Sequence, residues 1–353
     1  MNQKEDISSV RLIKETLLEY YNLGKIASIT PLESGFQSDN AKVTAETGVY
    51  VAKILHQSAE HAHDNMVVCD ILALLGVKTA KPIRAVSDDF AVGLGAKKSL
   101  VVQLFIPGTP VFRENKEQMY GKMSWYGEQI GTFHRISNGI SIELVKQNVK
   151  SATFFADSIK YIMDSSEEAF STFPKHPKNR WVKERFERWK KEAHRILEHA
   201  RLSKGIIQGD LKPGDIFIEN GRLAGLIDFG ASCYDYFMSE LGSWSMYTRL
   251  YDTEVSERFK EFILPYLNRS KIPIDELKTL PFFIETEGYD QIFYHANRQF
   301  HHVTQGLDEG DDKGNMRGYV AGIEVIESAA MLHQRYFHDL ATEALEEATQ
   351  SEI

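Results

Sequence analysis

A predicted β-hairpin with two aspartates at one end, and a third on the loop before it, constrains this chain more than any other feature. It lies in residues 205–230, which read GIIQGDLKPGDIFIENGRLAGLIDFG. Asn220-Gly221 predicts a two-residue turn, because both central residues of the favoured turn need positive φ. The turn would place Asp215, at the start of the first strand, beside Asp228, at the end of the second. Asp210 follows a short apolar strand and lies on the adjoining loop.

Two carboxylates at the same end of a hairpin, with a third on the adjoining loop, make a hard oxygen site. Mg²⁺ prefers such a site when it also keeps waters and binds phosphates. Phosphoryl transfer uses this arrangement, because metal ions bridge the phosphate oxygens while a separate carboxylate orients the attacking hydroxyl. A lone aspartate in a Gly-Asp pair, such as Asp210, is usually a turn residue, and Asp215 taken alone could cap the hairpin. The pattern of all three favours phosphoryl transfer.

Upstream of this segment the pattern is mainly β, after an amphipathic helix at 10–21. A second helix at 58–75 would end at Gly76, which suits a left-handed C-cap. Alternation and β-branched residues predict five strands, at 26–32, 41–44, 49–55, 83–86 and 100–106. Pro107-Gly108 breaks the last apolar run and predicts a hinge.

Downstream of the hinge the chain is mainly helical. Periodicity predicts helices at 116–137, 152–170, 179–201, 234–251 and 318–347. Residues 308–314 predict an acidic surface loop; a calcium loop is disfavoured because its twelfth position is Tyr319 and not Glu. We therefore expect an α+β, bilobal chain, with a small β-rich N-lobe over 1–106 and a larger, mainly helical C-lobe over 107–353.

Composition narrows the classes of partner. The formal net charge of −9, from 50 acidic and 41 basic residues, argues against nonspecific nucleic-acid binding, which depends on Lys and Arg. No run approaches the ~18 apolar residues that a membrane span needs. Cys69 and Cys233 are too few for a disulfide framework. We expect a cytoplasmic protein without a nucleic-acid or membrane partner, and the oligomeric state stays open.

The residues of the hairpin segment resemble a known signature. Gln208-Gly209-Asp210-x4-Asp215, followed by Ile227-Asp228-Phe229-Gly230, is similar to the motifs of the aminoglycoside phosphotransferase and choline kinase superfamily, near its homoserine kinase and methylthioribose kinase types. Ser34-Gly35-Phe36, the stretch 49–54 and the hinge 105–108 resemble that family's phosphate loop, third-strand lysine and hinge. The resemblance implies a protein-kinase-like fold.

The resemblance also implies a reaction and a role for each matching residue. The reaction is ATP-dependent transfer of the γ-phosphoryl group to a hydroxyl of a small polar acceptor, such as an amino alcohol, a sugar-like metabolite or an aminoglycoside-type antibiotic. The implied catalytic residues are Asp210, which accepts or orients the hydroxyl proton, and Lys212, which reaches the transferring phosphoryl. The implied ATP-binding residues are Ser34, Gly35, Lys53, Leu104, Ile106, Phe217 and Ile227, and the Mg²⁺ ligands are Asp215 and Asp228.

Three departures from the family pattern bear on catalysis. Gln208 stands where the family usually has His, and Asp215 where it usually has Asn. The glutamate that usually pairs with the lysine has no obvious counterpart to pair with Lys53; Glu60 and Asp64 are nearest in position. The changes at positions 208 and 215 keep a nucleotide-binding pseudokinase open as an alternative.

A protein Ser/Thr kinase is a second alternative, because Asp210-Leu-Lys-Pro213 is similar to the catalytic loop of that class. Against it, no Ala-Pro-Glu element follows Gly230 to close an activation segment. The preference for ATP over GTP is not fixed by these residues.

A cluster of acidic and aromatic residues lies beyond the matching segment, in the part of the chain that often shapes the family's acceptor pocket. It comprises Glu285, Glu287, Tyr289, Asp290, Phe293, Tyr294 and His295. Such a cluster suits a cationic acceptor. A helix packed on one face and wetted on the other explains it equally well.

Overall fold

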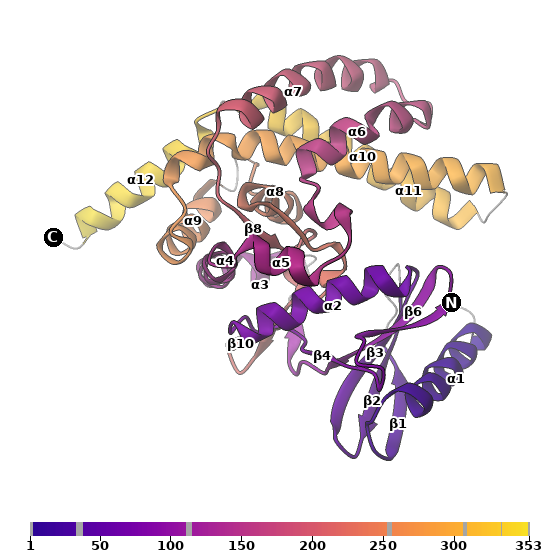
Figure 1. The fold of residues 1–353 in the computed structure, drawn as a ribbon. Helices are drawn as coiled ribbons and strands as arrows, with labels where there is room; N and C mark the ends of the chain where they lie inside the picture. Colours follow the sequence, from indigo (N-terminus) through magenta and orange to yellow (C-terminus); the bar gives the residue numbers. More distant parts are fainter. Residues whose placement is uncertain are drawn as a thin grey trace. The chain divides into compact units, whose positions relative to one another are not determined.

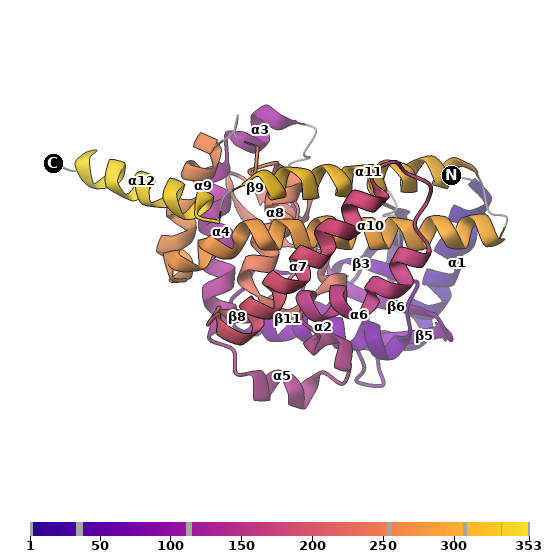
Figure 2. The ribbon, with the colours of Figure 1, turned by 90° about the horizontal axis from the view of Figure 1, so that it is seen from above.

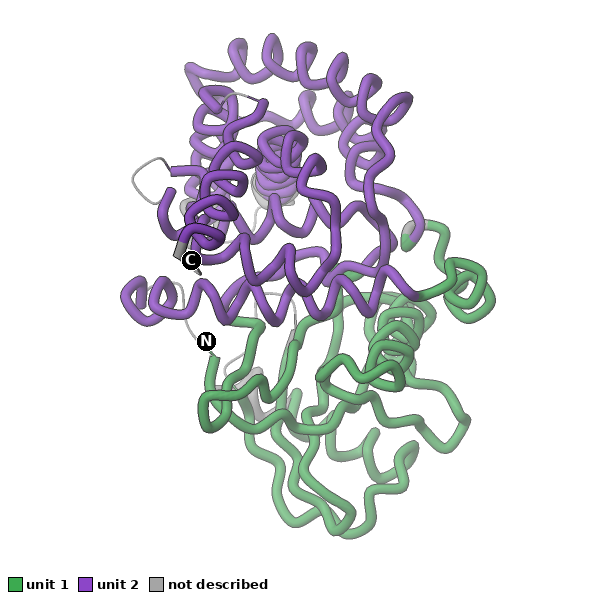
Figure 3. Tube along the Cα trace, turned by 90° about the vertical axis from the view of Figure 1, so that its left-hand side faces the viewer, with its two compact units in different colours: residues 1–111, 140–154, 214–232 green, residues 112–139, 155–213, 233–353 purple. Residues whose placement is uncertain are grey.

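The computed structural model describes residues 3–32, 38–110, 115–252, 256–305, 309–332 and 334–351. The chain forms two compact units, and both are discontinuous in sequence (Figure 3). Unit 1 comprises 1–111, 140–154 and 214–232; unit 2 comprises 112–139, 155–213 and 233–353. The boundary expected after residue 106 stays a prediction.

Unit 1 is built on an antiparallel sheet in the order β1-β2-β3-β6-β4, with β5 paired to β6. Its strands are β1 (Ile26–Pro31), β2 (Ser38–Ala45), β3 (Gly48–Leu55), β4 (Pro82–Ile83), β5 (Ala91–Gly95) and β6 (Lys98–Leu104). Along β3 the side chains of Tyr50, Ala52 and Ile54 are buried, whereas Val51 and Lys53 between them are half-buried. This period of two assigns Lys53 to the face opposite the core.

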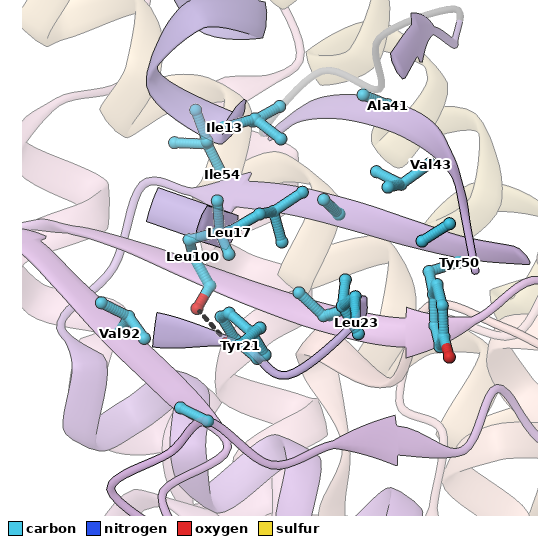
Figure 4. Packing of buried hydrophobic residues seen from close by; sticks show 14 residues of the cluster. Ile13, Leu17, Tyr21, Leu23, Ala41, Val43, Tyr50, Ile54, Val92 and Leu100 are labelled. Atoms are coloured by element: carbon cyan, nitrogen blue, oxygen red, sulfur yellow. Dashed lines mark hydrogen bonds between the residues drawn. The ribbon is translucent and has the colours of Figure 1, made fainter. Parts of the chain in front are cut away.

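The core of unit 1 lies between this sheet and α1 (Gln3–Tyr20). Ile13 and Leu17 of α1 are almost fully buried against Ile54 and Leu100 of the sheet (Figure 4). The Tyr21 hydroxyl, just after the helix, donates to the Leu100 carbonyl at 3.4 Å. Burial of one leucine or isoleucine side chain contributes about 1.5–3 kcal/mol, so these contacts hold α1 on the sheet.

The predicted hairpin is present in unit 1. It comprises β9 (Ile216–Glu219) and β10 (Arg222–Leu226), and β7 (Thr109–Pro110) pairs with β9. Asn220 and Gly221 have φ values of 51° and 73°. The left-handed turn predicted from Asn-Gly is therefore confirmed. The unit also contains α2 (Ala59–Leu74), followed by Gly76 with a φ of 91°, and α5 (Ile142–Asn148).

Unit 2 is mainly helical. Its helices are α3 (Lys116–Tyr120), α4 (Met123–Asn138), α6 (Ser158–Ser171), α7 (Asn179–His199), α8 (Phe237–Thr248), α9 (Ser256–Ser270), α10 (Leu280–Gln305), α11 (Glu309–Met331) and α12 (Tyr336–Ser351). α10 and α11 run side by side along most of their length (Figures 1 and 2). Two short strands, β8 (Lys204–Ile207) and β11 (Cys233–Tyr236), pair antiparallel within this unit.

The structure corrects two predictions near the C-terminus. The single helix expected at 318–347 is two helices, α11 and α12. Residues 309–314, expected as a loop, form the first turns of α11, and Asp308 lies outside the described residues. Their Asp and Gly content favours a loop locally, but packing against α10 overrides this weak preference. Gly288 and Gly322 allow the two helices to approach closely.

The predicted fold class is confirmed, because a β-sheet region precedes a larger helical region. Among the described residues no helix is both long enough and apolar enough to cross a lipid bilayer.

The crossing of α4 and α9 yields a stability test. A Cβ atom at Gly127 of α4 would overlap the backbone oxygen of Phe262 on α9. We expect Gly127→Ala to lower the free energy of unfolding by about 1–3 kcal/mol, measured by urea denaturation, because overpacking outweighs the better helix propensity of alanine. Gly139→Ala is the control, since its nearest neighbour would lie at an ordinary 3.4 Å. Equal stability of the two variants would contradict this packing.

Candidate active site

The loop that carries Asp210 begins where β8 ends. β8 is anchored by its pairing with β11 and by the Ser137 hydroxyl, which donates to the Ile206 carbonyl at 2.7 Å. Gly209 then takes a φ of 88°, a left-handed conformation that a residue with a side chain rarely adopts. The chain turns sharply here and brings Asp210 to the end of the short sheet.

A buried carboxylate on α8 holds the start of this loop. Glu240 is fully buried, and its Oε1 accepts hydrogen bonds from the backbone amides of Gln208 at 2.6 Å and Gly209 at 3.1 Å. Its Oε2 lies 2.6 Å from Nε2 of His134 on α4. The other ring nitrogen of His134 lies 2.8 Å from the Tyr266 hydroxyl of α9. Three helices thus fix the loop through one side chain.

The Asp210 carboxylate is held on both oxygens. Oδ1 accepts a hydrogen bond of 2.6 Å from the Tyr247 hydroxyl of α8, and Oδ2 accepts one of 2.9 Å from the Lys212 ammonium. The Asp210 backbone amide donates to the side-chain oxygen of Gln208 at 2.8 Å. The glutamine therefore braces the loop with its own hydrogen bond. Because Asp210 remains partly exposed, with 43% of its side chain accessible, it can meet a ligand.

The hairpin of unit 1 brings Asp215 and Asp228 close to each other. The backbone amide of Ile227 donates to the Asp215 carbonyl at 3.0 Å, so the residue before Asp228 lies against Asp215. Asp215 is buried and Asp228 is exposed. Among the described residues no group of three or more His, Cys, Asp or Glu gathers as a closed metal site would need. Two carboxylates fit Mg²⁺, which completes its shell with waters and phosphates. That Asp210 converges on them stays a prediction.

The charges of Lys53 and Asp228 both influence one buried thiol. Burial raises the pKa of Cys69 on α2 to about 12; the positive charge of Lys53 lowers it, and the negative charge of Asp228 raises it further. Both charges therefore lie within electrostatic range of the Cys69 thiol.

Neither expected carboxylate pairs with Lys53 among the described residues. Oδ2 of Asp64 instead accepts the backbone amides of Lys150 and Ser151, at 3.1 and 2.7 Å. Asp64 is therefore a structural residue that ties α2 to the segment after α5.

The residues predicted to contact adenine lie at the hinge and the hairpin. Pro110 of β7 pairs with Phe217 of β9, and Gly225 of β10 pairs with Phe217 from the other side. The side chain of Ile106 packs closely on Gly225. The Leu104 amide donates to the Lys81 carbonyl at 2.8 Å. Ile106 and Phe217 thus share one neighbourhood, whereas Ser34 and Gly35 lie outside the described residues.

The sequence analysis did not identify two residues that hold Asp210 or its loop. Glu240 carried a signal, since an acidic residue inside an otherwise apolar helix needs a buried partner. Tyr247 carried none, because nothing in its local sequence indicates a contact 37 positions away.

Comparison with known proteins assigns the chain to a family. Residues 28–270 match the model of the phosphotransferase enzyme family. The chain belongs to this family. The phosphotransferase assignment confirms the resemblance found in the sequence. The roles of individual residues stay predictions.

Individual relatives of this phosphotransferase are distant. A homoserine kinase of Methylocella silvestris is 23% identical over 228 residues, which are 62% of this chain and 63% of the relative. The amicoumacin kinase hAmiN, solved with AMP-PNP, Ca²⁺ and Ami, superposes with a TM-score of 0.64 at 17% identity, over 92% of this chain and 96% of that one. A microcompartment-associated aminopropanol kinase has a TM-score of 0.56 at 13% identity, over 94% and 98%.

The buried carboxylate of this phosphotransferase yields a stability test. Glu240→Ala would leave His134 and the amides of Gln208 and Gly209 without their acceptor. We expect a loss of about 3–5 kcal/mol in the free energy of unfolding, as for other broken buried pairs, and faster amide exchange at Gln208 and Gly209. Glu240→Gln, which keeps a side-chain oxygen, should lose less.

The control is Glu346→Ala, an exposed residue on α12 whose change should stay within about 0.5 kcal/mol. Denaturation and hydrogen exchange are the measurements. Unchanged exchange at Gln208 and Gly209 in Glu240→Ala would show that Glu240 does not hold the loop.

Proposed function

We propose that this protein transfers the γ-phosphoryl group of ATP to a hydroxyl of a small polar molecule. The family assignment and the kinase relatives support this class of enzyme. The observation that carries the proposal is the Asp210 carboxylate, because both of its oxygens are fixed and part of its surface is open.

Asp210 would orient the acceptor hydroxyl and take its proton. A carboxylate suffices for this step when the transition state is loose, since little negative charge must develop on the attacking oxygen. Lys212, bound to Asp210, would stand beside the transferring group as a positive point charge. Tyr247 would act through Asp210 by holding its orientation.

The nucleotide would be bound by unit 1. Within the described residues the Ile106 amide has no hydrogen-bond partner, so it is available to the edge of adenine. The Leu104 amide already donates to the Lys81 carbonyl, so Leu104 would contribute its carbonyl oxygen. Phe217 and Ile227 would cover the faces of the base. Lys53 would bind the α- and β-phosphates, and it is available because no carboxylate pairs with it in the described part of the chain. Ser34 and Gly35 would approach the triphosphate.

Asp215 and Asp228 would hold Mg²⁺, which neutralises charge on the phosphates when it is bound. A solved relative with AMP-PNP and Ca²⁺ supports the use of a nucleotide and a divalent cation in this fold.

The two alternatives are less well supported. A protein kinase needs a segment on which a peptide lies, but here the chain passes from Phe229–Ala231 through β11 directly into α8. A pseudokinase was suggested by Gln208 and Asp215. Of these, Gln208 accepts a hydrogen bond from the Asp210 amide and so keeps the loop in place.

The first test is Asp210→Asn. The amide keeps the shape of the side chain but accepts no proton, so we expect kcat to fall about 10²–10⁴-fold while the affinity for ATP stays the same. ADP release is measured with a panel of small alcohols, and ATP affinity by calorimetry. Asp88→Asn, on an exposed turn with a φ of 71°, is the control. Substantial remaining turnover would assign the base to another residue.

The second test separates Tyr247 from a purely structural role. A hydrogen bond to a charged group contributes about 1.5–3 kcal/mol, so Tyr247→Phe should lower kcat about tenfold or more. The KM for ATP should not change, because ATP is assigned to unit 1. Tyr20→Phe on α1 is the matched control. If kcat is unchanged, or if it falls only together with the melting temperature, Tyr247 does not position Asp210.

A further inference from the structure

The turn that follows Asp228 is held by a side chain of α2 that the catalytic scheme does not use. Asn65 is only 3% exposed, and its amide nitrogen donates a hydrogen bond of 3.0 Å to the Gly230 carbonyl. The two residues are 165 positions apart, and both belong to unit 1. α2 therefore contacts directly the backbone that continues from the proposed metal ligand.

Asp228 has a backbone conformation that needs support from its surroundings. Its φ of 64° and ψ of 50° lie in the left-handed region, which a residue with a side chain rarely adopts. Such a conformation costs free energy and persists only where neighbouring contacts determine it. A relaxed backbone would point the carboxylate in another direction. The contacts on either side of Asp228 therefore decide where its carboxylate lies.

Backbone hydrogen bonds hold the chain on the entry side of Asp228. The Leu226 amide donates to the Lys78 carbonyl at 2.8 Å, and the Ile227 amide donates to the Asp215 carbonyl at 3.0 Å. These bonds restrain the end of β10 and the residue after it. They stop one residue before Asp228, so the exit side needs contacts of its own.

On the exit side a short turn and α2 hold the chain together. Residues Phe229–Ala231 form a 3₁₀ turn, which the Ser232 amide closes by donating to the Phe229 carbonyl at 3.2 Å. The Phe229 side chain is buried. The closing bond lies within the turn, whereas the bond from Asn65 to Gly230 ties the turn to another element of unit 1.

Asn65 lies on the face of α2 that is turned toward the proposed phosphate- and metal-binding residues. Cys69 is four positions later, so the two side chains project from the same face of the helix. Burial raises the pKa of the Cys69 thiol, and the charges of Lys53 and Asp228 both influence it. No carboxylate of α2 pairs with Lys53 within the described residues. At this face α2 instead supplies the amide donor of Asn65.

We propose that Asn65 is a positioning residue for the metal ion, because it fixes the turn that sets the direction of the Asp228 carboxylate. The proposal rests on the proposed function, in which Asp228 binds Mg²⁺. Asn65 acts through the Gly230 carbonyl and the Asp228 backbone, without contact to the ion. When its hydrogen bond is removed, the left-handed residue can relax. The carboxylate then no longer meets the near-ideal octahedral geometry that Mg²⁺ demands.

The test measures Mn²⁺ binding to the full chain in the presence of AMP-PNP, by electron paramagnetic resonance of the free ion. Asn65→Leu keeps the approximate size of the side chain but donates no hydrogen bond. We expect its Mn²⁺ affinity to fall about three- to tenfold, because one hydrogen bond is lost and the turn relaxes. The affinity for AMP-PNP without a divalent cation, measured by calorimetry, should stay the same. Asn65→Ala removes the same donor without apolar bulk and should behave alike.

Hydrogen exchange of the metal-free chain gives a second measurement, which does not depend on catalysis. Amides 230–232 should exchange faster in Asn65→Leu than in the parent. The matched control is Asp64→Asn, on the neighbouring residue. It weakens the bonds to the amides of Lys150 and Ser151 and leaves the bond to Gly230 in place. It should therefore lower the unfolding temperature without changing the Mn²⁺ affinity.

The outcomes separate the role of Asn65 from the proposed reaction. If the parent binds Mn²⁺ and both Asn65 variants bind it equally well, the inference is overturned and phosphotransfer stands. A lower affinity for AMP-PNP without a divalent cation also overturns it, because Asn65 would then act on the nucleotide. Weaker Mn²⁺ binding in a chain that transfers no phosphoryl group to any alcohol supports the role of Asn65 and overturns the proposed reaction. If the parent binds no Mn²⁺ with AMP-PNP, the inference and the metal role of Asp228 are both overturned.

Discussion

The Glu240 carboxylate connects the helical interior of unit 2 to the backbone amides that begin the catalytic loop. Its second oxygen is hydrogen-bonded to His134, which in turn is hydrogen-bonded to Tyr266. The loop is therefore anchored to α4, α8 and α9. Burying a carboxylate is costly unless each lone pair is used, and here both oxygens have donors. The position of Asp210 follows from this network and from the Gln208 brace.

The sequence predicted the parts of the site that depend on local rules. Asn220-Gly221 specifies its own turn, and the turn pairs β9, which Asp215 directly precedes, with β10, which ends two residues before Asp228. Contacts between distant helices follow no such local rule. The hydrogen bond from Tyr247 to Asp210 and the donor set of Glu240 depend on how α8 packs, which neighbouring residues do not encode.

Helix boundaries near the C-terminus show the same limit. The Asp- and Gly-rich residues 309–314 have loop composition, yet they are helical because α11 gains its stability from packing along α10. The close approach at Gly288 and Gly322 supplies contacts that a single-sequence pattern does not register. Local propensity was a poor guide where tertiary packing dominated.

The buried acidic side chains of unit 2 fall into two groups, which differ in whether they accept hydrogen bonds. Glu240, Glu285 and Asp235 are saturated with donors and serve the structure. Glu287 and Asp290 accept no hydrogen bond from any described residue, and burial raises the pKa of both carboxyl groups.

The most direct measurement is a crystal structure of the chain with Mn²⁺, AMP-PNP and an alcohol acceptor, with manganese located by anomalous scattering. The account predicts the manganese peak at the carboxylates of Asp228 and Asp215, and the acceptor hydroxyl about 2.6–3.2 Å from Asp210. Manganese bound at neither aspartate, or an acceptor seated away from Asp210, would contradict it.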